Sequence, residues 1–415
     1  MSLCPPASPR GRLSPARRDP VGKVELALAS VLAAGALAAC SGAAHGGGGH
    51  QVSSPGAQPV SFSTNLGPGR HAEDVPVDTV VKMSASGGQL DAVHLTFDAG
   101  GTQGTVPGTL SKDGTSWVAD GLLEPGADYR LGATGTSIDG APARQISIFS
   151  TQDLSLDQQT FPSVAPLRDT TVGVGMPVIV TFDVPVTDRA AAERHLSVES
   201  TPAVRGTWHW VDDTEVHYRP RRFWPAGADV TVHADLNGVD VGNGIYGQES
   251  REVSFHIGSS VIDRINLRTH RLRVVINGRL ARTIPITGGK PGFETRSGTK
   301  VIMEKFLSKR MDAATTGIAP SNPEYYNIAN VQYAMRVTNS GEFLHAAPWS
   351  VADQGSANVS HGCVGMSTAN AHWLFDRSHI GDVVIVKGSN RSMEAGNGWT
   401  DWNQSYASYK QGSAL

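Results

Sequence analysis

Residues 343–349 read FLHAAPW, and residues 360–365 read SHGCVG. The second segment contains Cys363, and the first contains His345, 18 residues earlier. The nucleophile of a cysteine enzyme is the thiolate, and a free thiol with a pKa of about 8.5 is mostly protonated at neutral pH. An imidazole beside the sulfur removes its proton, and Gly362 lets the backbone turn tightly there. The pattern favours a cysteine nucleophile with His345 as its base, and His361 is the alternative base.

Alternating strands surround these two segments. Asn277-Gly278 is a two-residue hairpin signal between two apolar runs, and Ser367 can cap a short helix that ends near Asp376. Residues 331–337 alternate before a turn at 339–341, and residues 383–386 are a buried strand. We therefore expect a mixed, mainly β domain at residues 257–388. Residues 306–330 are long for a connection and predict a lid over the site.

Two similar β-rich segments precede this domain. Gly126-Ala127-Asp128 recurs as Gly227-Ala228-Asp229, an offset of 101 residues, which is about the size of an immunoglobulin-type sandwich. We predict two tandem immunoglobulin-like β-sandwiches at residues 60–150 and 151–256, acting as spacers. Trp208, Trp210 and Trp224 are expected in core or interdomain packing. The strand histidines, which are His209, His217, His233 and His256, are expected to face solvent and to bind no metal.

The start of the chain has the pattern of an export signal. An Arg-rich stretch precedes 14 apolar or small residues from Leu26 to Ala39, fewer than the roughly 20 that a membrane-spanning helix needs. Leu37-Ala38-Ala39-Cys40 resembles the lipobox of bacterial lipoproteins, and an ordinary signal peptide with a chance cysteine is the alternative. We expect a signal peptide at 1–39, lipidation of Cys40 and a flexible tether at 40–59. The protein would then lie on the outer face of the cytoplasmic membrane.

Cysteine count and charge narrow the function further. If Cys4 leaves with the signal and Cys40 is lipidated, Cys363 is the remaining thiol and no intramolecular disulfide can form. The formal net charge is -3, and without residues 1–39 the chain keeps 30 basic and 36 acidic residues. This balance provides no global basic field, so nucleic acid is not an expected partner.

FLHAAPW followed by SHGCV resembles the signature of L,D-transpeptidases with a YkuD-type catalytic domain. Val301-Ile302-Met303 also resembles the family, and the spacing between histidine and cysteine matches. Over nearly the whole chain, the order of segments is similar to the mycobacterial and actinobacterial type: a membrane-bound or lipidated N-terminus, two Ig-like domains, the catalytic domain and a Trp-rich tail at 389–415. The resemblance implies a mainly β fold of two Ig-like sandwiches followed by the YkuD-type domain.

The resemblance also implies roles for individual residues. Cys363 would attack the carbonyl of the third residue of a peptidoglycan stem peptide and expel the terminal D-Ala, and His345 would take the thiol proton. The carbonyl of Ala346 would orient the imidazole, and backbone N–H groups around Gly362 and Cys363 would bind the oxyanion. An amine of a neighbouring stem would resolve the thioester into a 3→3 cross-link.

Substrate contacts and inhibitors follow from the same resemblance. The expected substrate-contacting residues are Ser340, Gly341, Tyr325 or Tyr326, Ser360, His361 and Gly365. Carbapenems are expected to acylate Cys363, and no metal or cofactor is implied. The family usually has Asn or Arg at the position of Gly365 and Ser at the position of Ala346, so a side-chain contact at 365 is missing here.

Two alternatives to a transpeptidase remain at this point. An L,D-carboxypeptidase would form the same acyl-enzyme and resolve it with water. A non-catalytic wall-binding lipoprotein would carry Gly365 as the sign of a decayed site, and Cys363 would then be a small buried hydrophobic residue.

The aromatic residues of the tail, Trp399, Trp402, Tyr406 and Tyr409, have helical spacing and are expected to pack against the catalytic domain.

Overall fold

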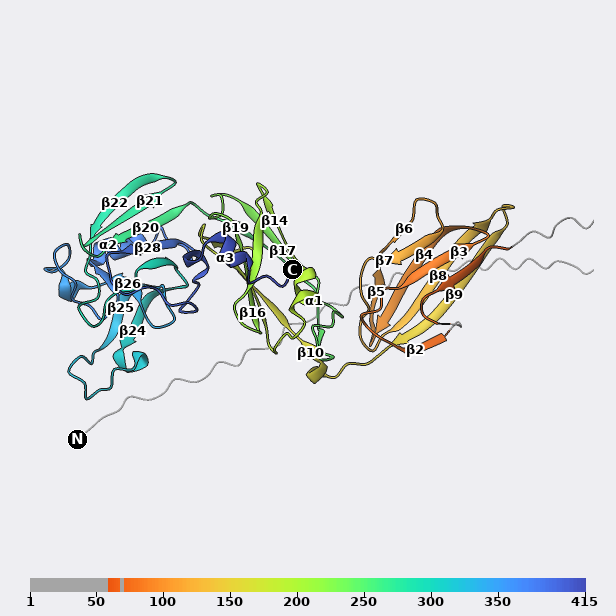
Figure 1. Cartoon of the computed structure of the whole chain (residues 1–415), viewed down its shortest axis with the longest axis horizontal. Helices are drawn as coiled ribbons and strands as arrows, with labels where there is room; N and C mark the ends of the chain where they lie inside the picture. The colour runs from red at the N-terminus through yellow and green to blue at the C-terminus, as the bar shows by residue number, and fades with distance from the viewer. Residues whose placement is uncertain (1–58, 68–70) are drawn as a thin grey trace, which may run out of the picture. The chain divides into compact units, whose positions relative to one another are not determined.

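The computed structural model of the chain describes residues 59–67 and 71–415. The predicted signal peptide, the lipidation of Cys40 and nearly all of the predicted tether lie outside these residues. None of the helices within the described ranges combines the length and the apolar character that crossing a membrane requires. Strands dominate the rest of the chain, which confirms the prediction of a mainly β protein (Figure 1).

The first module is a pair of sheets that enclose an apolar core. One sheet has the order β1 (Ser61–Thr64), β3 (Lys82–Ser86), β7 (Ser116–Ala119) and β6 (Gly108–Leu110). The other has the order β2 (His71–Val75), β9 (Pro142–Thr151), β8 (Asp128–Ser137), β4 (Gly88–Ala99) and β5 (Thr102–Val106). Alternate residues of β8 are buried, including Tyr129 and Leu131, because one face of the strand packs on the core.

The second module repeats this arrangement. Its sheets have the orders β11 (Pro162–Ala165), β13 (Val178–Phe182), β16 (Glu215–Pro220), β15 (Gly206–Trp210), and β12 (Thr171–Val172), β19 (Arg251–Ile257), β17 (Asp229–Ala234), β14 (Leu196–Thr201). Smaller elements are β10 (Gln159–Thr160), which pairs with β18 (Tyr246–Gly247), the helix α1 (Arg189–Arg194) and the 3-10 turn η1 (Leu156–Gln158). Trp208, Trp210 and Trp224 all lie in its core.

The third module contains two sheets and one helix. The first sheet has the order β22 (Arg279–Pro285), β21 (Arg271–Ile276), β20 (Val261–Asn266), β28 (Val383–Lys387) and β23 (Gly298–Val301). The second has the order β24 (Glu304–Asp312), β25 (Asn327–Arg336), β26 (Phe343–Ala346) and β27 (Val364–Met366). Helix α2 (Thr368–Phe375) begins at Ser367, whose side chain accepts from the Asn370 N–H. Asn277 and Gly278 both have positive φ, as the predicted hairpin turn requires.

The predicted lid is shorter than the sequence suggested. All of residues 306–312 belong to β24, and β25 begins at Asn327. The irregular connection therefore spans residues 313–326 and starts with the 3-10 turn η2 (Ala313–Thr316). Another 3-10 turn, η3 (Pro348–Ser350), follows β26. The burial pattern of β24 is irregular and its register shifts between Lys309 and Met311, so apolar alternation could not mark where the strand ends.

The aromatic residues of the C-terminal extension pack against the second module, which corrects the expectation that they pack against the catalytic domain, whereas Glu394 and Asn397 of the extension do bond to the catalytic domain. The extension contains the 3-10 turn η4 (Asp401–Asn403) and the helix α3 (Tyr406–Lys410). The Trp402 Nε1–H donates to the Gly175 carbonyl at 2.7 Å, and the Tyr409 ring stacks on His209 with centroids 4.4 Å apart. Contact with the catalytic sheet is polar, through the Asn403 amide and the backbone of Thr299. Helical spacing revealed an apolar face but not its partner.

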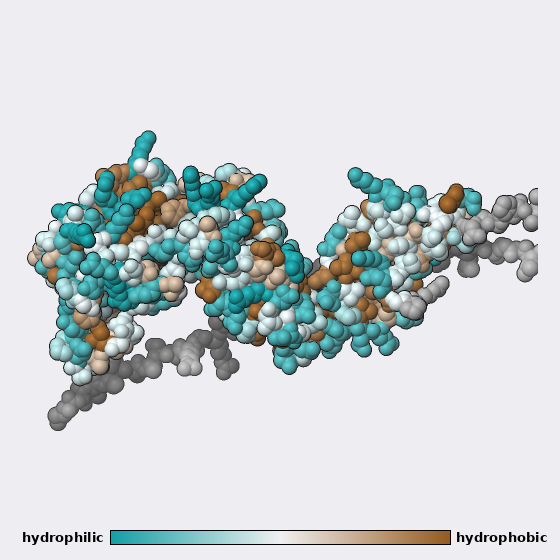
Figure 2. All heavy atoms as spheres, in the orientation of Figure 1, coloured by the Kyte–Doolittle hydropathy of each residue, from teal (hydrophilic) through white to brown (hydrophobic). Residues whose placement is uncertain are grey.

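Two strand histidines contradict the prediction that they face solvent: His209, whose Nδ1 lies 2.8 Å from the Tyr409 carbonyl oxygen, and His217. His217 on β16 is buried and not solvent-facing, and its imidazole lies between the carboxylates of Asp401 (2.9 Å) and Glu215 (2.8 Å). Its companion His256 is half-exposed, as expected. Figure 2 shows that the visible surface is largely hydrophilic or intermediate in hydropathy, with separate apolar spots.

Candidate active site

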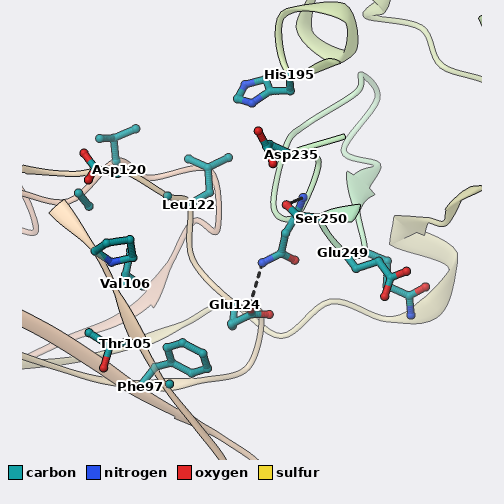
Figure 3. Close-up of a pocket in the computed structure, with 17 residues that line it drawn as sticks. Phe97, Thr105, Val106, Asp120, Leu122, Glu124, His195, Asp235, Glu249 and Ser250 are labelled. Carbon is teal, nitrogen blue, oxygen red and sulfur yellow. Dashed lines mark hydrogen bonds between the residues drawn. The ribbon is translucent and has the colours of Figure 1, made fainter. Parts of the chain in front are cut away.

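Two cavities compete as the site of chemistry. A cavity of about 710 Å³ is lined by residues such as Phe97, Glu124 and His195 (Figure 3), and the Asn237 amide donates to Glu124 there at 3.0 Å. Its lining contains no cysteine and no serine–histidine pair in contact. A smaller cavity of about 300 Å³ is lined by both Cys363 and His345. The smaller cavity therefore combines a nucleophile with a base.

The two motifs meet because β26 and β27 are neighbouring parallel strands. Their register pairs Leu344 with Val364, His345 with Gly365 and Ala346 with Met366. Cys363 stands immediately before β27, and Gly362 precedes it with a φ of 120°, a conformation that favours glycine. Pairing of these strands thus brings residues 18 apart in the sequence to one wall of the cavity.

The His345 imidazole is fixed by its own strand. Its Nδ1 lies 2.7 Å from the Ala346 carbonyl oxygen, so Nδ1 carries the hydrogen and Nε2 is left to accept a proton. Burial lowers the pKa of His345, and the bond to Ala346 opposes that shift. The imidazole is therefore neutral at neutral pH, which is the form that a base needs. The ring of Trp349 stacks on it at a centroid distance of 5.9 Å.

The thiol of Cys363 is in a resting, protonated form. It is 8% exposed, and it donates to the Gly341 carbonyl oxygen at 3.6 Å. Burial raises its pKa to about 12. Within residues 59–67 and 71–415, no hydrogen bond joins this thiol to the His345 imidazole. The thiol must therefore leave Gly341 before His345 can take its proton.

The peptide between Gly362 and Cys363 is held from both sides. The Ser360 hydroxyl donates to the Cys363 carbonyl at 2.6 Å and accepts from the Gly362 N–H at 3.2 Å. The Thr295 hydroxyl donates to the Gly362 carbonyl at 2.8 Å. The Gly362 N–H, one of the two groups expected to bind the oxyanion, is thus already bonded to the Ser360 hydroxyl. The Cys363 N–H is therefore the better candidate for binding the oxyanion. Sequence reasoning missed Thr295, because it lies in an irregular segment far from the motif.

The expected substrate residues divide between two cavities. Tyr326 lines the cavity with Cys363, whereas Tyr325 does not, and its hydroxyl accepts from the Asn327 amide at 3.1 Å. Ser340 and Gly341 line an adjacent cavity of about 120 Å³ that Tyr326 also borders. The Ser340 N–H and hydroxyl are both bonded to Asn397 of the C-terminal extension.

His361 lines the cavity that contains Cys363 and His345, but its imidazole pairs with a carboxylate instead. Its Nε2 lies 2.8 Å from a carboxylate oxygen of Glu324, which also pairs with Lys290 at 2.5 Å. The bond from Lys290 is the main reason that the pKa of Glu324 is lowered. Because these contacts occupy the His361 imidazole, His361 is not suited to act as the base for Cys363. They also hold the connection at residues 313–326 to the edge of the cavity. Neither Glu324 nor Lys290 carries a motif that sequence reasoning could have used.

Gly365 has a packing reason to be glycine in this chain. A Cβ built on it would lie 2.8 Å from the Ala347 Cβ and 3.5 Å from the Thr287 side chain. Its backbone is also bonded in both directions to Thr287. Ala347 therefore occupies the space that a side chain at 365 would need. In the described part of the chain, no group of three or more His, Cys, Asp or Glu residues could hold a metal ion.

Comparison with known proteins agrees with this geometry. The family model described as L,D-transpeptidase catalytic domain matches residues 262–386, and the bacterial Ig domain model matches residues 72–240. L,D-transpeptidase 2 of Mycobacterium tuberculosis (strain CDC 1551 / Oshkosh) is 35% identical over 344 residues, which cover 83% of each chain. L,D-transpeptidase 5 of Mycobacterium tuberculosis (strain ATCC 25618 / H37Rv) is 32% identical and covers 84% of this chain and 76% of its own.

Among solved structures, an LD transpeptidase in complex with imipenem is 39% identical, with a TM-score of 0.48 over 54% of this chain and 97% of its own. The likeness to L,D-transpeptidase 2 is the decisive one, because it extends over most of both chains. The residues that the catalytic-domain model matches, 262–386, contain both His345 and Cys363. This chain is therefore a member of the L,D-transpeptidase family, with Ig-like modules before its catalytic domain.

Proposed function

We propose that the chain forms 3→3 cross-links in peptidoglycan through a thioester on Cys363. The observation that carries the proposal is that the Cys363 thiol and the His345 imidazole, oriented by the Ala346 carbonyl, line one cavity. In the first step His345 takes the thiol proton, and the sulfur attacks the carbonyl carbon of the third residue of a tetrapeptide stem. The C–N bond to the terminal D-Ala breaks, and the proton on His345 passes to the departing amine.

The second step reverses the roles of the two residues. The side-chain amine of the third residue of an acceptor stem attacks the thioester carbon, and His345 takes the proton that this amine loses. The C–S bond breaks, the sulfur is reprotonated, and the new amide is the cross-link. The exchange of one amide for another needs neither a metal nor ATP.

Oxyanion binding is assigned to the Cys363 N–H. Ser360 and Thr295 fix the peptide on each side of Gly362, so this N–H keeps its direction while the carbonyl carbon becomes tetrahedral. Removing one such donor typically costs about 2.7–4 kcal/mol of transition-state stabilisation. A rigid peptide contributes here because no reorganisation is needed at the moment of attack.

The location of the enzyme forms part of the proposal. The sequence Leu37-Ala38-Ala39-Cys40 supports lipidation of Cys40 and an anchor on the outer face of the cytoplasmic membrane. Two acyl chains suffice for stable anchoring, since each buried CH₂ contributes about 0.8 kcal/mol. The Ig-like modules would then act as spacers between the membrane and the wall.

Incubation of the protein with disaccharide-tetrapeptide, followed by mass spectrometry, tests the reaction. A dimer that has lost one D-Ala supports transpeptidation. A tripeptide monomer would indicate an L,D-carboxypeptidase, and unchanged substrate would indicate a non-catalytic wall-binding protein. The matched control is Cys363→Ala, which removes the sulfur from a buried position and should give no product.

Acylation by a carbapenem tests the nucleophile independently of peptidoglycan. We expect the protein to gain the mass of the opened drug on the peptide that contains Cys363. His345→Gln should slow this gain at least tenfold, because no base then takes the thiol proton. A Cys363→Ala protein that still gained the drug's mass would refute the assignment of the nucleophile.

A further inference from the structure

A buried group of charges lies close to the Gly362–Cys363 peptide. It consists of Lys300 on β23, Glu342 just before β26, and Arg296. Lys300 is 1% exposed and Glu342 is 3% exposed. Lys300 pairs with one carboxylate oxygen of Glu342, while the Arg296 backbone N–H and guanidinium each donate to the other oxygen at 3.0 Å. Both oxygens of the carboxylate are thus occupied.

Burial of this kind is costly and calls for a reason. A charge that is removed from water loses several kcal/mol of solvation, and a buried ion pair often contributes no more stability than a packed apolar pair. The third module already has a large apolar core that includes Leu344 and Met335. Stability alone therefore does not explain why Lys300 and Glu342 lie inside.

Their position links them to the nucleophile. Glu342 directly follows Gly341, whose carbonyl accepts the Cys363 thiol, and its side chain passes the face of Gly362, with its Cγ 3.7 Å from the place of a Cβ there. The residue before Arg296 is Thr295, whose hydroxyl fixes the Gly362 carbonyl. The charged group thus lies close to the peptide that carries the sulfur, and none of its three residues lines the cavity with Cys363.

We propose that Lys300 and Glu342 are positioning residues that set the ionisation of Cys363 in opposite directions, with the Lys300 ammonium favouring the thiolate and the Glu342 carboxylate opposing it. The inference rests on the proposed function only in taking Cys363 as the nucleophile. It does not depend on which acceptor resolves the thioester.

The electrostatic signs are those of simple charges near a developing anion. Burial is the main cause that raises the pKa of Cys363, and a hydrogen bond to the backbone of Phe343 lowers it. Of the nearby charges, the Glu342 carboxylate raises the pKa and Lys300 lowers it. The pKa of Lys300 is itself lowered by burial and raised by Glu342 and by Cys363. The other titratable groups that line the cavity with the sulfur are Tyr326, His345 and His361. A nearby charge shifts a pKa by about 1–3 units, so each variant should change the thiolate fraction at a fixed pH at least tenfold.

Alkylation by iodoacetamide measures this fraction without peptidoglycan or drug. The rate at the Cys363 peptide is followed by mass spectrometry between pH 6 and 9 in the parent chain, Lys300→Met and Glu342→Gln. We expect Lys300→Met to react about tenfold more slowly than the parent at each pH, and Glu342→Gln about tenfold faster. The double variant should return towards the parent rate, because the two effects oppose each other.

Glu394→Gln is the matched control. Glu394 pairs with the Arg296 guanidinium, is itself half-exposed, and has Arg391 and Asn397 as its other side-chain partners. Its loss should leave the alkylation rate within twofold of the parent. A purely structural role predicts that Lys300→Met and Glu342→Gln change the rate in the same direction, through loosening of the site.

Changes in the same direction, or unchanged rates, would overturn the proposal. If Glu342→Gln fails to fold, the alkylation rates of Lys300→Met and of the double variant test the proposal. The expected result is slow alkylation in Lys300→Met and a rate closer to that of the parent in the double variant. Failure of the cross-linking assay with the expected alkylation rates would refute the proposed function and leave this inference standing.

Discussion

The contact between the C-terminal extension and the second module should depend on pH through His217. Its imidazole is fully buried between Asp401 of the extension and Glu215 of β16, and the Tyr409 hydroxyl donates to the same Asp401 oxygen at 2.7 Å. Burial alone would lower the pKa of His217, but the Asp401 and Glu215 carboxylates outweigh it and raise the pKa from 6.5 to about 9. Asp401→Asn keeps the shape of the side chain and removes its charge.

The pKa shift of His217 gives the size of its contribution to stability. A rise of about 2.5 pH units corresponds to about 3 kcal/mol of stability, at about 1.4 kcal/mol per unit. Because the folded-state pKa lies above the unfolded value, this stability is complete below about pH 6.5 and is lost as the pH rises through about 9. In Asp401→Asn the imidazole has Glu215 as its remaining carboxylate partner, so most of this contribution should be missing at pH 6.

Hydrogen-exchange mass spectrometry of residues 401–412, corrected for the intrinsic pH dependence of exchange, measures the opening of the extension. Exchange in Asp401→Asn should be about a hundredfold faster than in the parent at pH 6, and the two should converge near pH 10. Asp229→Asn is the matched control, because it breaks the pair with His256, whose members are 46% and 77% exposed and which should contribute at most about 1 kcal/mol. Equal exchange in Asp401→Asn and the parent at pH 6 would refute the reasoning.

Three further outcomes are expected. A Cβ at Gly412 would lie 2.1 Å from Nδ1 of His209, so Gly412→Ala should destabilise the extension by roughly 1–3 kcal/mol in urea unfolding. Burial without a hydrogen-bond partner raises the pKa of Asp263 to about 7, so this carboxyl destabilises the fold as the pH rises from about 4 through 7. Asp263→Asn should then raise the urea midpoint at pH 8 and leave it nearly unchanged at pH 4. Gly365→Asn should slow carbapenem acylation about tenfold, because its side chain displaces Ala347, and a simultaneous Ala347→Gly should restore part of the rate.

The core of the candidate site followed from sequence because it depends on local patterns. Alternating apolar residues define the strands, and the hairpin signal Asn277-Gly278 and the helix cap Ser367 mark where elements start and turn. Two short motifs that end one strand and begin another can meet when those strands pair in parallel, as β26 and β27 do. The resemblance of the motifs then supplied the chemistry that pattern alone leaves open.

The partners of buried polar groups did not follow from sequence. Alternation on β16 predicts two faces but does not say what covers the face that carries His217, and its partner Asp401 lies 184 residues away. Likewise, the aromatic spacing of the extension predicts an apolar face, and only the folded chain shows that Gly175 and His209 of the second module receive it. The periodicity of a sequence indicates which side chains share a face, and it does not indicate which residues that face contacts.

Lys300 and Glu342 illustrate the same limit within the active site. Charged residues are almost never fully buried unless they are paired, so the sequence alone predicts that Lys300 and Glu342 lie at the surface. Glu342 nevertheless precedes four strand residues that are all buried, Phe343 to Ala346, and it follows the turn that holds the thiol. A lone carboxylate at the start of such a strand needs a cation from elsewhere, since its charge would otherwise lie unpaired in a low dielectric. Lys300, in a strand of the other sheet, meets that need, and its positive charge favours the thiolate of Cys363 on which the proposed function depends.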